Sequence, residues 1–93
     1  MAAIPGLTRG PSRYGHGSAF LAGGREVAHF HGENRMDVRL TREVIRVRKS
    51  EGGFDARVKT RGASAEWVEV HFFAASDFAL VLTLVEEAVR ANS

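Results

Sequence analysis

Short apolar runs separated by turn residues fill the first half of the chain. Residues 18–22 and 26–31 are two such runs, and Gly23-Gly24 between them is typical of a tight hairpin turn. Residues 36–40 alternate Met, Asp, Val, Arg and Leu, the period-2 pattern of a half-buried strand. We therefore predict three strands here, preceded by a Gly- and Pro-rich irregular lead-in over residues 1–17.

The middle of the chain predicts a helix and a weak strand. Thr41 has the hydroxyl of a good helix N-cap, and the predicted helix begins at Arg42 and ends before Gly52-Gly53. Valine and isoleucine within that stretch lose rotamer freedom in a helix, so a strand is the competing interpretation. Residues 54–61, centred on Val58, are expected to be extended.

The last third predicts a strand and a helix with strong patterns. Residues 67–73 alternate and have high β-propensity, while Ser76 and Asp77 suit a helix start. The helix has a wide apolar arc, which indicates deep burial or a contact with a second copy of the chain. The residues that repeat at helical spacing are Phe78, Val81, Leu82, Val85 and Val89.

These elements predict one two-layer α+β domain over residues 1–93, in the order β-β-β-α-β-β-α, with a mainly antiparallel sheet. Alternation assigns one sheet face to the core beneath the helices and the other to polar residues. The expected core face carries Ala28, Phe30, Val38, Leu40, Val68, Val70 and Phe72. The expected open face carries Val27, His29, His31, Asp37, Arg39, Trp67, Glu69, His71 and Phe73.

Composition excludes several kinds of chemistry. The 93 residues contain no cysteine, so disulfides, cysteine-ligated metals and thiol nucleophiles are absent. No Gly-x-Gly-x-x-Gly or Gly-Lys-Ser/Thr phosphate loop occurs, and we predict no cofactor. The start of the chain does not resemble a signal peptide, and no apolar run is long enough to span a bilayer, so we expect a cytoplasmic protein without a membrane contact.

The net charge of +2 is modest, but basic residues gather between positions 42 and 61. Such a segment could follow the phosphates of a nucleic acid, although a solvated helix face beside an exposed strand is the simpler interpretation. The basic residues concerned are Arg42, Arg46, Arg48, Lys49, Arg57, Lys59 and Arg61.

The histidines carry the sharpest chemical hypothesis. His29 and His31 stand two residues apart on one predicted strand, so both imidazoles leave the same face. If the strands adjoin, further polar residues and an aromatic wall converge there, and three histidines could bind a metal or serve as general bases. Ordinary cross-strand partnership is the competing interpretation. The candidate ligand-binding residues are His29, His31, His71, Trp67, Glu69 and Asp37.

Three stretches resemble a family of small bacterial luciferase-domain proteins: residues 23–32 with His-Phe-His-Gly, residues 37–45 with Leu-Thr-Arg-Glu-Val-Ile, and residues 66–70 with Trp-Val-Glu-Val. The resemblance covers residues 4–91. The family is distantly similar to fungal luciferases, which oxidise a hydroxylated pyrone with oxygen. For the small bacterial members the resemblance implies no particular reaction.

The order of elements alone also resembles YjbR-like proteins, which have been suspected of binding DNA. Three functions follow as hypotheses: a small-ligand-binding or accessory domain, an oxygenase or hydrolase that uses the histidines, and a nucleic-acid-binding domain. We expect the first, with an unidentified small molecule as partner and the final helix available for homodimer formation.

Overall fold

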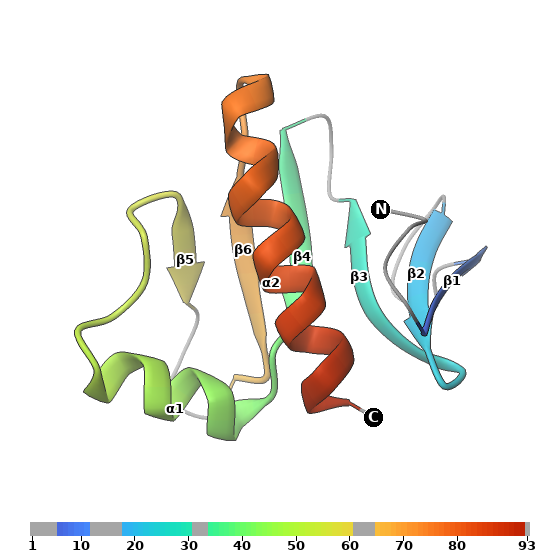
Figure 1. The fold of residues 1–93 in the computed structure, drawn as a ribbon, viewed down its shortest axis with the longest axis horizontal. Coiled ribbons are helices and arrows are strands. Elements are labelled where there is room, and N and C mark those ends of the chain that lie inside the picture. The colour runs from blue at the N-terminus through green and yellow to red at the C-terminus, as the bar shows by residue number, and fades with distance from the viewer. Residues whose placement is uncertain (1–5, 12–17, 31–33, 61–64, 93) are drawn as a thin grey trace.

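The computed structural model describes residues 6–11, 18–30, 34–60 and 65–92 (Figure 1). Within them, six strands form one antiparallel sheet in the order β1-β2-β3-β4-β6-β5. The strands are β1 Leu7–Pro11, β2 Ser18–Ala22, β3 Arg25–Phe30, β4 Arg35–Arg39, β5 Val58–Thr60 and β6 Trp67–His71. The helices are α1 Arg42–Ser50 and α2 Phe78–Ala91, with a 3-10 turn η1 at Ala75–Asp77. The predicted α+β class is confirmed.

Helix α2 crosses one face of the sheet, where it contacts β3 and β4 (Figure 1). The core beneath it contains the predicted residues Ala28, Val38, Val68 and Val70, none of which has any exposed surface. The prediction is wrong for Phe30, which ends β3 and is 44% exposed. Four residues of α2 are buried against this core, namely Val81, Leu84, Val85 and Ala88. The wide apolar arc of the helix therefore packs on its own sheet, while homodimer formation stays a prediction.

Helix α1 lies at one end of the sheet and buries Ile45 in the same core (Figure 1). Its presence settles the choice between helix and strand for this stretch. The predicted hydroxyl cap is wrong, because Thr41 makes no side-chain capping hydrogen bond and has a φ of 79°. Its backbone N–H instead donates to the carbonyl of Glu66 at 3.0 Å, which joins the start of α1 to the start of β6.

Strand β1 lies within the predicted irregular lead-in, so that prediction is wrong for residues 7–11. Leu7 joins the core, and the strand pairs with β2 along its length. Gly10 permits close packing, since a Cβ there would stand 2.9 Å from Leu21 Cδ1. Pairing with a neighbouring strand thus outweighs the turn tendency of glycine and proline.

A bulge between β2 and β3 changes the faces of two residues. Phe20 pairs with Ala28 and Leu21 with Glu26, so Val27 is the extra residue on β3. Val27 is fully buried in the core, whereas alternation assigned it to the open face. Glu26 instead comes to lie beside His29, the residue with which it forms an ion pair.

The described part of the chain contains no helix that combines the length and the apolar character needed to cross a membrane.

Candidate functional site

Polar side chains lie in register across the sheet face opposite α2. His29 of β3 pairs with Asp37 of β4, and Asp37 pairs with Glu69 of β6. The neighbouring position pairs Arg39 with Trp67. Paired residues on adjacent strands point to the same face, so the strand order brings together residues that are up to 40 positions apart.

His29 stands between two buried carboxylates. Its Nε2 lies 3.0 Å from Asp37 Oδ2 and its Nδ1 lies 2.9 Å from Glu26 Oε2. The side chains of Glu26, His29 and Asp37 are 3%, 12% and 6% exposed, so little water screens the three groups. Each ring nitrogen of His29 therefore stands close to one carboxylate oxygen. We call these three residues the carboxylate–histidine cluster.

Trp67 covers one side of this cluster. Its ring centroid lies 5.1 Å from that of His29, with 53° between the two ring planes. Because Trp67 begins β6, directly after Glu66, the indole stands at the end of the sheet where α1 also begins. The predicted aromatic wall beside His29 is therefore present.

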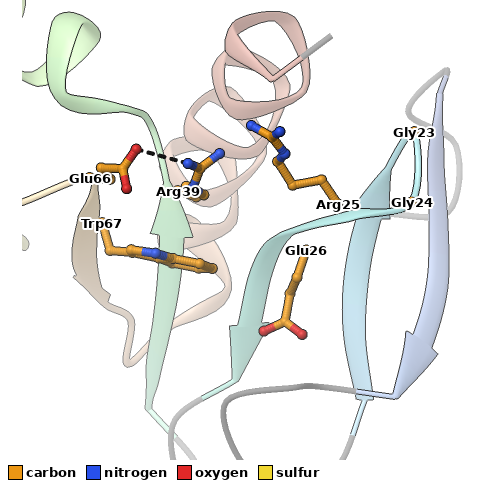
Figure 2. Close-up of a pocket in the computed structure, with 7 residues that line it drawn as sticks. All are labelled: Gly23, Gly24, Arg25, Glu26, Arg39, Glu66 and Trp67. Carbon is orange, nitrogen blue, oxygen red and sulfur yellow. Dashed lines mark hydrogen bonds and ion pairs between the residues drawn. The ribbon is translucent and has the colours of Figure 1, made fainter.

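A pocket of about 390 Å³ opens next to Trp67 (Figure 2). Strands β3 and β4 pair only from Ala28 to Phe30, and the ribbons diverge toward the Gly23-Gly24 turn (Figure 1). The pocket lies at this diverging end, between the hairpin and the start of β6. Its lining residues are Gly23, Gly24, Arg25, Glu26, Arg39, Glu66 and Trp67.

Arg39 is held in place at the pocket wall. One of its nitrogens, Nη2, lies 2.8 Å from Glu66 Oε1, the contact drawn in Figure 2. Its other terminal nitrogen donates to Asn92 Oδ1, and the Asn92 amide donates back to the carbonyl of Arg39 at 2.9 Å. The C-terminal end of α2 thus braces this side chain from behind.

Glu26 connects the pocket to the carboxylate–histidine cluster. It lines the pocket and also contacts Nδ1 of His29, whose other nitrogen contacts Asp37. The wall of the pocket therefore contains a carboxyl group that has an imidazole and a second carboxyl group behind it.

The remaining predicted ligand residues lie farther along the same face. His71 Nε2 stands 3.8 Å from Glu69 Oε2, and Arg35 Nη1 stands 3.9 Å from that oxygen. None of these three lines the pocket. His31 falls outside the described residues. Among the residues that the structure does describe, no group of three or more His, Asp or Glu side chains is arranged to hold a metal ion.

The predicted basic segment is divided between two elements. Arg48 forms an ion pair with Glu87 of α2, and Arg57 forms ion pairs with Asp55 and Asp77. Arg42, Arg46 and Lys49 are exposed on α1, and Lys59 is exposed on β5; Arg61 lies outside the described residues. Nucleic-acid binding through this segment stays a prediction.

Of the seven residues that line the pocket, only Trp67 is among the candidate ligand-binding residues predicted from the sequence; the others are Gly23, Gly24, Arg25, Glu26, Arg39 and Glu66. Gly23-Gly24 correctly predicted the turn, but a turn signal does not indicate what stands opposite it. Strict alternation places Glu26 on the face opposite to His29, and the bulge reverses that. For Glu66, the available signal was its position directly before the predicted strand that begins at Trp67.

A comparison with protein-family models matches the Luciferase domain to residues 24–88. The match extends from Gly24 of the hairpin through most of α2, and so includes the carboxylate–histidine cluster and every lining residue of the pocket except Gly23. The chain belongs to the Luciferase domain family. No curated protein and no solved structure matches the chain.

Proposed function

We propose that this protein is a small-ligand-binding domain and that its ligand occupies the pocket beside Trp67. The observation that carries the proposal is the pocket itself: about 390 Å³, the size range of small-molecule sites, with an aromatic wall and polar groups from three chain segments. Buried charged groups behind Glu26 support the proposal, because burying them is costly for stability and such costs concentrate at functional sites.

The chain is well suited to a direct test, because Trp67 is its only tryptophan. A library of anionic, neutral and cationic fragments that do not absorb near 295 nm would be screened by Trp67 fluorescence. Hits would be mapped by amide chemical shifts. We expect at least one class to change the emission and to shift Gly23, Gly24 and Arg25. The proposal fails if no fragment does so, or if all shifts fall elsewhere.

A second candidate function, catalysis, is favoured by one observation: Glu26 belongs both to the pocket and to the carboxylate–histidine cluster. In an enzyme of this design, an oxygenase or a hydrolase, Glu26 would touch the substrate and His29 would share its proton. Glu26→Gln keeps the shape of the side chain and removes its basicity. An enzyme should then bind its ligand and lose turnover, whereas a binding domain shows no turnover in either form.

A further inference from the structure

Four charged side chains line the pocket, and they differ in whether they have a partner of opposite charge. Glu26 has His29 as its partner, and Glu66 has Arg39. Arg25 lines the pocket and is exposed, and its side chain makes no hydrogen bond or ion pair with any other described residue. The pocket therefore contains one cationic group that is available to a ligand, while its other charges already have partners.

The pocket also contains a flat surface, the indole of Trp67. In Figure 2 the indole of Trp67 extends toward β3, and the side chains of Arg25 and Arg39 reach the same end of the pocket. A flat ring gains most by packing on an indole, and a guanidinium recognises a carboxylate through two parallel N–H donors.

We propose, on the basis of the ligand-binding function above, that the ligand is a small aromatic monocarboxylate: its carboxylate pairs with Arg25 and its ring packs on Trp67. One negative charge balances the one available cation. A phosphate dianion is disfavoured because the carboxylates of Glu26 and Glu66 line the same pocket. A cationic ligand would place its charge beside Arg25 and Arg39.

The test uses 2-naphthoate with three matched compounds, each titrated by calorimetry and by amide chemical shifts. 2-Naphthamide has the ring without the charge, cyclohexanecarboxylate has the charge without a flat ring, and 2-naphthyl phosphate has a second negative charge. We expect 2-naphthoate to bind with shifts at residues 23–26 and 67. We expect the amide to bind about tenfold more weakly or worse, because an interaction with a charged group is lost.

Two substitutions of Arg25 and one control substitution test the carboxylate contact. Arg25→Gln should weaken 2-naphthoate about tenfold and leave 2-naphthamide unchanged. Arg42→Gln, which removes an exposed arginine on α1, is the matched control and should change neither. Arg25→Lys keeps the charge without the planar fork and should give an intermediate affinity. Amide spectra of each variant establish that the fold is intact.

The outcomes separate this inference from the proposed function. If naphthamide or naphthyl phosphate binds as tightly as naphthoate, or if Arg25→Gln has no effect, the carboxylate assignment is wrong. If the fragment screen finds only neutral or cationic ligands in the pocket, the ligand class is wrong and the binding function stands. If no fragment reaches the pocket, both proposals fail.

Discussion

In the carboxylate–histidine cluster, one imidazole stands between two acidic side chains. Glu26 and Asp37 are both buried, and each lies within 3.0 Å of a nitrogen of the same imidazole. A buried ion pair adds little net stability compared with apolar residues, but removing one partner leaves an uncompensated charge. His29 is therefore needed for stability even though it stands beside the candidate site.

His29→Ala should lower the free energy of unfolding by about 3 kcal/mol at pH 7, because two buried carboxylates lose their common partner. Urea unfolding followed by circular dichroism measures the loss. His71→Ala is the matched control, since that imidazole is 25% exposed and stands 3.8 Å from Glu69; its effect should stay within about 1 kcal/mol. Equal stability of His29→Ala and the wild type would show that the cluster is not an ion-pair arrangement.

At the scale of elements, Asp77 joins the end of β6, the start of α2 and the turn before β5. Its Oδ2 accepts the backbone N–H groups of Phe73 and Ala74, at 2.8 Å and 3.0 Å. Its other oxygen, Oδ1, accepts from Arg57, which also pairs with Asp55. Asp77, and not the predicted Ser76, directly precedes α2. Its carboxylate makes no capping hydrogen bond to the helix and instead accepts from the segment between β6 and η1.

These contacts make part of the stability depend on pH. The backbone N–H of Phe73, the Arg57 guanidinium and the N–H of Ala74 lower the pKa of Asp77 from its ordinary value of 3.8. The folded state therefore binds fewer protons than the unfolded state just below pH 4, and stability falls as the pH falls through that range. Asp77→Asn should lose less stability than the wild type between pH 5 and pH 2. Urea unfolding at each pH measures the free energy of unfolding of both proteins. An equal loss of stability in the variant and in the wild type would contradict this.

A substitution in β6 tests whether the sheet face beneath α2 is the core face. Val70 pairs with Met36 and Val58 and has no exposed surface, so Val70→Asp places an unpaired charge in the core. We expect this variant to lose the native amide spectrum. Phe73→Asp adds the same charge two residues after β6 at a side chain that is 74% exposed, and it should stay folded. A folded Val70→Asp protein would overturn the assignment of this face to the core.

Much of this architecture was predictable from local patterns, because alternation and helical spacing report burial directly. The core residues Val38, Val68 and Val70 follow from period 2, and Val81 and Val85 from helical period. Strand β1 was not predictable, since its hydrogen bonds come from β2 rather than from its own composition. The bulge at Val27 was also hidden, because one extra residue reverses the faces that alternation assigns.

At the scale of the whole molecule, the pocket depends on contacts between distant segments. The hairpin at residues 23–26, Arg39 at the end of β4, and residues 66–67 meet only because β4 lies between β3 and β6. Sequence patterns indicated His29, Asp37 and Trp67 as neighbours on one face. They could not indicate that β3 and β4 diverge beyond Ala28, which opens the space that a ligand would occupy.

The division of the basic segment predicts weak binding to nucleic acid. Arg48 and Arg57 are engaged with acidic side chains, so fewer charges remain to contact phosphates. We expect little binding of single-stranded DNA or RNA at physiological salt, and any binding at low salt should fall steeply as salt is added. Fluorescence anisotropy across a salt series measures this. A tight complex at physiological salt would show that Arg42, Arg46 and Lys49 form a sufficient interface.

The central claim, that a small aromatic ligand binds over Trp67, is tested most directly by nuclear Overhauser effects between ligand and protein. With 2-naphthoate present, we expect contacts from the naphthalene ring protons to the indole protons of Trp67 and to the Hα protons of Gly23 and Gly24. Phe73 and Phe78 offer a rival apolar surface, being 74% and 54% exposed. Contacts to these two rings, with none to Trp67, would contradict the claim.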